Sequence, residues 1–211
     1  MLGKSGIFIT FEGGEGAGKT TLIEGISRHF LSLGYSILKT REPGGTKIGE
    51  QIRSLLLEHR EEKVSPYAEL CLFLASRAQH IEEVIMPALE MGKVVLCDRF
   101  NDSSVAYQGI ARGLGKVQVA QTCAFISEGL EPHLTFYLDI DPSVGLSRVQ
   151  KTREQDRIEV EGIAFHTKIR NAYLELQKQY PKRIHRLDAT LPKEEVYREA
   201  VDVILRNLHV V

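Results

Sequence analysis

A glycine-rich loop between an apolar strand and a helix constrains this 211-residue chain more than any other feature. Ile7–Phe11 is a short β-rich run, and a helical pattern extends from about Lys19 to Leu33. Between them stands Gly13-Gly-Glu-Gly-Ala-Gly-Lys-Thr20, which matches the P-loop pattern G-x-x-x-x-G-K-[ST]. Glycines let backbone N–H groups turn around phosphate oxygens, and the following helix points its positive end at the same anion. The loop therefore predicts a binding site for the phosphates of a nucleoside triphosphate.

Further apolar runs are typical of buried strands, and they alternate with helical patterns. The strand candidates are residues 35–40, 93–97, 134–139 and, more weakly, 184–187; the helical patterns include 48–58, 65–91 and 193–208. Continuous apolar strands separated by helices indicate a parallel sheet covered on both faces. We therefore predict an α/β fold, a doubly wound parallel sheet of about five strands flanked by helices, with residues 1–211 as a single P-loop domain. Ligands of such sheets bind at the carboxyl ends of the strands, so the segments that follow the strands should converge on one crevice.

The composition is that of an ordinary globular protein, and it excludes some functions. Lys and Arg number 27 against 28 Asp and Glu, for a formal net charge of -1. A protein that coats nucleic acid or an acidic membrane carries a basic excess, so neither partner is expected, although a local basic pocket is compatible with this total. Cys71, Cys97 and Cys123 are odd in number and widely spaced. We expect reduced thiols, no structural zinc site, no membrane span and a cytoplasmic protein.

The loop and the end of the third predicted strand supply the candidates for phosphate chemistry. Lys19 would place a point charge at the transferring phosphate, and the Thr20 hydroxyl would ligate Mg²⁺. Asp98 follows an apolar strand, as does the acid that supports Mg²⁺ in P-loop enzymes, and the planar fork of Arg99 matches phosphate oxygens. The predicted triphosphate-binding residues are Gly13, Gly14, Glu15, Gly16, Ala17, Gly18, Lys19, Thr20 and Thr21.

P-loop proteins fall into classes that differ in what accompanies the loop. A GTPase needs Asn-Lys-x-Asp to recognise guanine, and the chain contains no such segment. A large mechanical ATPase usually needs more residues and a companion domain. A small kinase needs only a second pocket that holds an acceptor next to the γ-phosphate. Thr40–Thr46 and Asn101–Gly109 follow predicted strands and are suited to form that pocket.

Five segments, in this order, resemble thymidylate kinases over nearly the whole chain. They are Phe11–Thr21, Thr40-Arg-Glu-Pro-Gly-Gly-Thr46, Asp98-Arg99, Ala106-Tyr-Gln-Gly109 and Asp156-Arg-Ile-Glu159. The Arg-Glu-Pro-Gly-Gly segment is the most distinctive, because a generic P-loop protein does not need it. The resemblance implies transfer of the γ-phosphate of ATP to dTMP with Mg²⁺ as cofactor, and a homodimer.

The resemblance also implies how the acceptor is held. Phe73 and Arg77 match a Phe and an Arg four residues apart, which places both on one helical face. Phe73 would stack on the flat pyrimidine, and Arg77 would donate to a ring carbonyl. Arg53 and Arg99 match the residues that clamp the acceptor phosphate, since positioning is most of the catalysis in phosphoryl transfer.

Further positions match the sugar and the base edge. Glu15, an acid among phosphate-binding amides, matches a carboxylate that meets the 3′-hydroxyl of the acceptor. Tyr107 matches a ring beside the sugar, which would leave no room for a 2′-hydroxyl. Ser104 and Gln108 match positions near the thymine edge, and Pro43 is predicted in the same substrate site.

The roles of one acid, Glu12, and of one basic segment, residues 150–158, stay open at this point. Glu12 is a further metal candidate beside Thr20 and Asp98, tied to Mg²⁺ through water, or it is a strand-terminal acid that accepts from local amides. Some family members carry an Arg directly after the P-loop acid, where this chain has Gly16. The transition-state arginine would then come from a lid over about residues 150–158, although a basic run of this kind is also typical of a solvated face.

The lid candidates are Arg148, Lys151, Arg153 and Arg157. Of these, Arg153 is predicted to act in catalysis together with Lys19, Asp98 and Arg99. Two alternatives to a thymidylate kinase remain: a kinase of another nucleoside monophosphate or small metabolite, and a non-catalytic nucleotide-binding subunit. The second would be expected to lose Lys19 or Asp98, and both are present.

Overall fold

The computed structural model describes residues 6–59, 61–152 and 154–207. Its five strands are β1 (Ile7–Glu12), β2 (Ile37–Arg41), β3 (Val94–Asp98), β4 (Leu134–Asp139) and β5 (Ile184–Asp188). They form one sheet in the order β2-β3-β1-β4-β5, and every neighbouring pair is parallel. The predicted parallel α/β sheet of about five strands is therefore confirmed.

Helices follow each strand along the chain. They are α1 (Lys19–Ser32), α2 (Lys47–Leu57), α3 (Pro66–His80), α4 (Met86–Glu90), α5 (Asn101–Ser104), α6 (Lys116–Ile126), α7 (Pro142–Gln150), α8 (Ile163–Gln179) and α9 (Lys193–Asn207). Two π-helical segments, η1 (Ile81–Ile85) and η2 (Val105–Ala111), continue α3 and α5. The helical pattern predicted over 65–91 is thus α3, η1 and α4 in succession, and Pro87 lies in the first turn of α4, where its missing N–H costs least.

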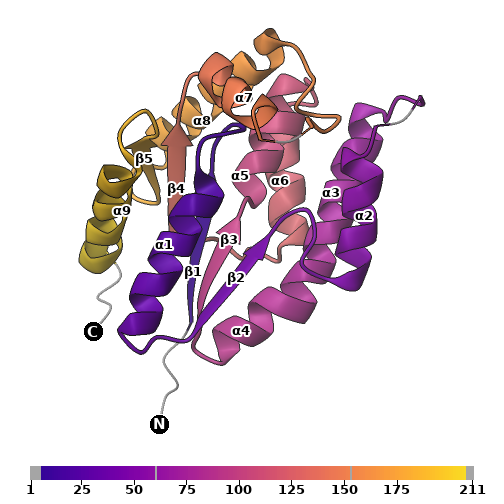
Figure 1. Cartoon of the computed structure of the whole chain (residues 1–211). Coiled ribbons are helices and arrows are strands. Elements are labelled where there is room, and N and C mark those ends of the chain that lie inside the picture. The colour runs from indigo at the N-terminus through magenta and orange to yellow at the C-terminus, as the bar shows by residue number, and fades with distance from the viewer. Residues whose placement is uncertain (1–5, 60, 153, 208–211) are drawn as a thin grey trace.

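Apolar residues of the strands are buried on both faces of the sheet. On one face, side chains such as Phe11, Leu96 and Phe136 pack against α1 and α9. On the other, Phe8, Val95 and Cys97 pack against η1, α4 and Phe100. A third cluster joins η2, α6 and α8 beside α3. Figure 1 shows α1 in front of the sheet, with α5 and α6 on its far side. This two-sided burial explains why the strands read as continuous apolar runs.

The register of the strands places their polar carboxyl ends side by side. Asp98 of β3 is the partner of Phe11 in β1 and of Arg41 in β2. The P-loop after β1 therefore meets the segments after β2 and β3 at one edge of the sheet, beneath α7 and α8 (Figure 1). Of the three free cysteines, Cys97 and Cys123 are buried and Cys71 is exposed. Among the described helices, none combines the length and apolar character that crossing a membrane requires.

Candidate active site

The P-loop between β1 and α1 has the backbone that a phosphate cradle requires. Gly13, Gly16 and Gly18 have φ angles of 142°, 67° and 97°, values that only glycine adopts readily. Lys19 Nζ donates to the carbonyl oxygens of Gly13 and Gly14, at 3.3 Å each. Burial lowers the pKa of Lys19 and Arg99 adds to this effect, while Asp98, Glu15 and Glu12 oppose it. The ammonium group is therefore held inside the loop among carboxylates.

Close packing of α7 on the loop explains why residue 16 is glycine. A Cβ added at Gly16 would lie 2.1 Å from Gly145 O, and one added at Gly145 would lie 2.2 Å from Glu15 O. No side chain fits between these backbones without a shift. The structure therefore has no room for an arginine directly after the P-loop acid, in agreement with the departure noted in the sequence.

Arg99 connects the P-loop acid to the segment after β3. Its guanidinium donates to Glu15 Oε1 at 2.5 Å, to Gly13 O at 3.0 Å and to Ser103 Oγ at 3.3 Å. Tyr107 donates to the same Glu15 oxygen at 3.0 Å and lies under the Arg99 guanidinium. Burial raises the pKa of Glu15, but Arg99, Lys19 and Tyr107 outweigh it and bring the pKa to about 2. Glu15 is thus an ionised group that faces Arg99 and Tyr107.

The backbone at Arg99 is unusual. Its φ is 74°, in the left-handed region that a non-glycine residue rarely adopts. The Arg99 N–H donates to Phe11 O at 2.9 Å, and the next N–H, of Phe100, donates to Glu12 Oε1 at 2.8 Å. These contacts hold the turn that aims Arg99 at the P-loop.

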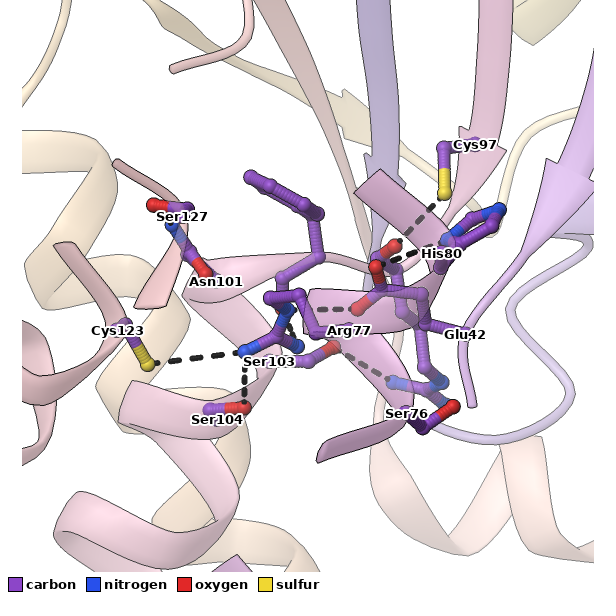
Figure 2. A network of polar contacts seen from close by, with 12 residues as sticks. Glu42, Ser76, Arg77, His80, Cys97, Asn101, Ser103, Ser104, Cys123 and Ser127 are labelled. Carbon is purple, nitrogen blue, oxygen red and sulfur yellow. Dashed lines mark hydrogen bonds and ion pairs between the residues drawn. The ribbon is translucent and has the colours of Figure 1, made fainter. Parts of the chain in front are cut away.

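A buried ion pair fixes Arg77 on α3. Its Nε donates to Glu42 Oε2 at 2.7 Å, while Nη1 donates to Ser104 Oγ at 2.9 Å and Nη2 to Phe100 O at 3.0 Å. His80 Nδ1 lies 3.1 Å from the other oxygen of Glu42. Figure 2 shows Glu42 between Arg77 and His80, with Ser104 and Cys123 on the far side of the guanidinium. Both charged side chains are at most 3% exposed, so Arg77 has a single orientation.

Most predicted acceptor residues line one cavity of about 510 Å³ that opens from the P-loop. Its walls include Glu15, Lys19, Pro43, Arg53, Phe73, Arg77, Asp98, Arg99, Ser104, Tyr107 and Gln108. Arg53 Nη1 donates to Pro43 O at 2.9 Å, which ties α2 to the segment after β2. Five separate stretches of the chain thus supply these residues to the same hollow.

A second cavity, of about 960 Å³, lies on the other side of the P-loop. It shares Gly16, Ala17, Gly18, Thr21 and Arg148 with the first. Its remaining walls come from α1, α9, the segment after β5 and Leu138 of β4. Residues such as Leu191 and Tyr197 in this wall were not predicted, because an apolar helix face carries no signal that separates a ligand wall from core. The loop therefore forms the boundary between two ligand-sized spaces.

Glu12 lies beneath the loop and lines neither cavity. It is fully buried, and its carboxylate accepts from Phe100 N, from Ser103 Oγ at 2.5 Å and from Tyr173 OH at 2.9 Å. Burial, with Asp102 adding to it, raises the pKa of Glu12 to about 7 despite these hydrogen bonds. These contacts match the alternative in which Glu12 accepts from local amides, and they leave its role as a metal-linked acid without support from the geometry.

The predicted lid residues separate in space. Arg148 on α7 is exposed, and its Nη1 lies 3.4 Å from Gly16 O and from Ala189 O, between the two cavities. Lys151 is exposed in the turn after α7. Arg157 donates instead to Leu56 O and to Glu69 Oε2, at 2.8 Å each, and so contacts α2 and α3 rather than the P-loop. Arg153 lies outside the described residues.

Several residues of the site carried no signal in the sequence. Glu42 accepts from Arg77 and contacts His80, Ser76 Oγ accepts from Gly44 N at 3.1 Å, and Glu69 accepts from Gln108. Each is a polar residue in a helix or loop whose partner is more than 30 residues away. The Glu within Arg-Glu-Pro-Gly-Gly was quoted as part of a motif, but its pairing depends on the tertiary structure.

Asp98 is the residue best placed to support a cation. Its Oδ1 is buried, lies 4.0 Å from Lys19 Nζ and accepts no hydrogen bond from the residues that the structure describes. Thr20 is exposed in the first turn of α1, on the same side of the loop. The described residues hold no cluster of three or more His, Cys, Asp or Glu side chains arranged for a metal. Carboxylate and hydroxyl oxygens suit Mg²⁺, which usually takes one or two protein ligands together with substrate phosphates.

Comparison with known proteins agrees with this geometry. The sequence model of the thymidylate kinase family matches residues 11–200. Thymidylate kinases of Protochlamydia amoebophila and Geobacillus thermodenitrificans are 48% and 45% identical, over 94% and 97% of this chain and 92% of each relative. The crystal structure of thymidylate kinase from Ehrlichia chaffeensis superposes with a TM-score of 0.76 at 30% identity, covering 95% of this chain and 99% of that one. The family model and these relatives cover nearly the whole chain, so the chain belongs to the thymidylate kinase family.

Proposed function

We propose that this protein transfers the γ-phosphate of ATP to dTMP, giving dTDP and ADP. The observation that carries the proposal is the junction of two cavities at the P-loop, one of them walled by Phe73, Arg77 and Tyr107. A phosphate held in the loop would face the smaller, acceptor cavity. ATP would place its base and sugar in the larger cavity and its phosphates against the loop amides and Lys19.

The acceptor would be held at three points. Phe73 would stack on the pyrimidine ring, and Arg77, whose orientation Glu42 fixes, would donate to a ring carbonyl. Arg99 and Arg53 would bind the acceptor phosphate, and the ionised Glu15 would accept from the 3′-hydroxyl. Tyr107, between Glu15 and Arg99, would exclude a 2′-hydroxyl and thereby favour a deoxyribose.

Transfer from this arrangement depends on position and charge. The acceptor phosphate is already a good nucleophile, so the site needs no strong general base. Lys19 would neutralise charge that develops on the transferring group, and Arg99 would keep the two phosphates in line despite their repulsion. Of the lid candidates, Arg148 already lies beside the loop, and Arg153 stays the predicted catalytic arginine from the sequence.

Mg²⁺ is the cofactor that the family implies, and Asp98 and Thr20 fit it. Asp98 Oδ1, which accepts no hydrogen bond from the described residues, and the exposed Thr20 lie on the side of the loop where phosphates would bind. Bound there, Mg²⁺ would supply charge neutralisation to the β- and γ-phosphates.

One assay separates this function from the alternatives. The protein is incubated with Mg-ATP and each nucleoside monophosphate in turn, and diphosphate formation is followed. Preference for dTMP supports the proposal, equal use of dCMP or AMP indicates another monophosphate kinase, and no turnover indicates a non-catalytic subunit.

The role of Lys19 has a separate test. Lys19→Ala should abolish transfer while keeping the circular dichroism spectrum of the wild type. Activity above about a tenth of wild type would contradict the role of Lys19.

The lid assignment has its own test. Arg153→Ala should lower kcat far more than the affinity for dTMP, because a transition-state contact does not act in the ground state. Arg157→Ala should have the smaller effect on kcat, since Arg157 contacts Glu69 and Leu56. The reverse order would show that Arg157 is the catalytic lid residue.

A further inference from the structure

Glu69 on α3 is a buried carboxylate behind the wall of the acceptor cavity. Its side chain is 1% exposed. Its Oε1 accepts from Gln108 Nε2 at 2.9 Å and from Arg112 Nε at 3.2 Å. Its Oε2 accepts from Arg112 Nη2 at 3.2 Å and from Arg157 Nη2 at 2.8 Å. Among the described residues, every donor to this carboxylate except Gln108 is therefore a guanidinium group.

These surroundings keep Glu69 ionised. Burial raises the pKa of Glu69, but the hydrogen bonds from Gln108, Arg112 and Arg157 outweigh burial and leave the pKa below its usual value. An ionised carboxylate accepts hydrogen bonds and donates none. It is the amide NH₂ of Gln108, and never the amide oxygen, that can face it.

The direction of the Gln108 amide oxygen, Oε1, is then fixed as well. With NH₂ directed at Glu69, the oxygen Oε1 is on the other branch of the amide, and Gln108 lines the acceptor cavity next to Arg77 and Ser104. Within the described part of the chain, no donor contacts Gln108 Oε1. We propose that Glu69 is a specificity-determining positioning residue, which orients the Gln108 amide so that the cavity presents a hydrogen-bond acceptor to the edge of the acceptor base.

This inference rests on the proposed function and extends it to base selection. Thymine carries an N–H donor at N3, whereas cytosine carries a bare acceptor nitrogen at the same position. An amide oxygen held toward N3 pairs with thymine and repels cytosine, and a site built for one polar partner rejects its mismatch strongly. Were the amide free to rotate, it would turn its NH₂ toward cytosine at little cost.

The variant Glu69→Gln should reverse the amide. The new NH₂ group must replace either Oε1, which faces one guanidinium nitrogen and Gln108, or Oε2, which faces two guanidinium nitrogens. The first position is favoured, because only Gln108 can rotate to offer an acceptor. Its own NH₂ would then point into the cavity.

The test compares kcat/KM for dTMP and dCMP at saturating Mg-ATP in wild type, Glu69→Gln and Arg112→Gln. We expect Glu69→Gln to reduce the dTMP/dCMP ratio by about tenfold or more, mainly through the KM of the acceptor, with the KM of ATP unchanged. Arg112→Gln is the matched control, because it removes two guanidinium hydrogen bonds to Glu69 and leaves both partners of the Gln108–Glu69 contact in place. It should keep the wild-type ratio.

Thermal unfolding of each variant separates specificity from stability. A Glu69→Gln protein that is less stable but keeps the ratio within twofold would overturn the inference. If Glu69→Gln does not unfold cooperatively, the double variant Glu69→Gln/Gln108→Glu decides. In the double variant the carboxylate at position 108 again directs acceptor oxygens into the cavity, so a preference for dTMP should be retained. Loss of that preference would overturn the inference. Wild type that does not prefer dTMP over dCMP would instead contradict the proposed function.

Discussion

At the scale of single residues, the acceptor cavity is built on buried charges that are each paired. Arg77 and Glu42 are both nearly inaccessible, and their ion pair is shared with His80, Ser104 and the carbonyl of Phe100. A buried pair of this kind contributes little net stability, yet removal of one partner leaves an uncompensated charge. The pair therefore acts chiefly to hold Arg77 in one orientation toward the cavity.

Removal of the Glu42 carboxylate should be costly for that reason. We expect Glu42→Ala to lower the free energy of unfolding by about 3–5 kcal/mol, measured by urea denaturation, because the Arg77 guanidinium stays buried without its partner. The matched control is Glu24→Ala, whose pair with Lys39 is about half exposed and should cost no more than about 1 kcal/mol. Equal effects of the two substitutions would show that Glu42 does not hold Arg77.

Glu12 should make stability depend on pH. Its pKa is raised from 4.5 to about 7, mainly by burial, so the folded state keeps a proton that the unfolded chain releases. Between these values the folded state binds more protons, and the free energy of unfolding should therefore fall as pH rises from about 4.5 to 7 and level off above.

Urea denaturation at pH 5, 6, 7 and 8 checks this for wild type and Glu12→Gln. The glutamine at position 12 of the variant does not titrate, so the stability of the variant relative to wild type should rise across the window. A constant difference between Glu12→Gln and wild type at all four pH values would contradict the prediction.

At the scale of elements, packing of α7 against the P-loop depends on the absence of two side chains. Gly16 and Gly145 bring the two backbones so close that a Cβ on either would overlap the other. Arg148 lies three residues after Gly145 on the same helix, so this contact sets where the Arg148 guanidinium meets Gly16 O and Ala189 O. The helix thus positions an arginine between the two cavities.

Substitution of Gly145 should disturb nucleotide binding. In Gly145→Ala the new methyl would lie 2.2 Å from Glu15 O, so α7 must shift away from the loop, and we expect the KM for ATP to rise about tenfold with a stability loss of about 1–3 kcal/mol. The control is Gly162→Ala, where an added Cβ meets no atom within 4 Å. An unchanged KM in Gly145→Ala would show that the close contact is not needed for ATP binding.

At the scale of the whole molecule, the homodimer implied by the family needs a surface. Exposed apolar side chains gather on two helices that contact each other: Tyr67 on α3, and Val117 and Phe125 on α6. Phe125 is 80% exposed. Because a large exposed apolar side chain marks a contact surface, we expect a second copy of the chain to cover this face.

The dimer prediction is tested by a substitution that introduces one negative charge on this face. Phe125→Glu should shift the sedimentation of the protein from dimer to monomer in analytical ultracentrifugation, because a carboxylate in the centre of an apolar interface would be desolvated without a partner. Leu191→Glu, at an exposed apolar residue remote from α3 and α6 in the chain, is the control and should leave the association unchanged. A wild-type monomer at micromolar concentration would contradict the homodimer.

Much of the fold was accessible from local patterns. The predicted ranges located all five strands to within a residue or two. In β1, β3 and β4 the signal was a continuous apolar run, because burial on both faces of a parallel sheet leaves that pattern. The edge strands β2 and β5 include partly exposed polar residues and gave a weaker signal. The π-helical segments η1 and η2 were not predicted, since a single extra residue in a helical turn depends on what packs against it. Lys19 was predicted from its place in the P-loop pattern, and Asp98 and Arg99 were predicted from the carboxyl end of the third strand.

By itself, the sequence determined the P-loop, the parallel sheet and the family, because these depend on residue spacing and on motifs of adjacent residues. Only the tertiary structure decided what each charge faces. It turned Glu12 inward toward Tyr173, engaged Arg157 with Glu69, and placed Glu42 against Arg77. The physical reason is that a buried ion pair or hydrogen bond joins residues far apart in the chain, and periodicity records only that a side chain is buried, never which partner it meets.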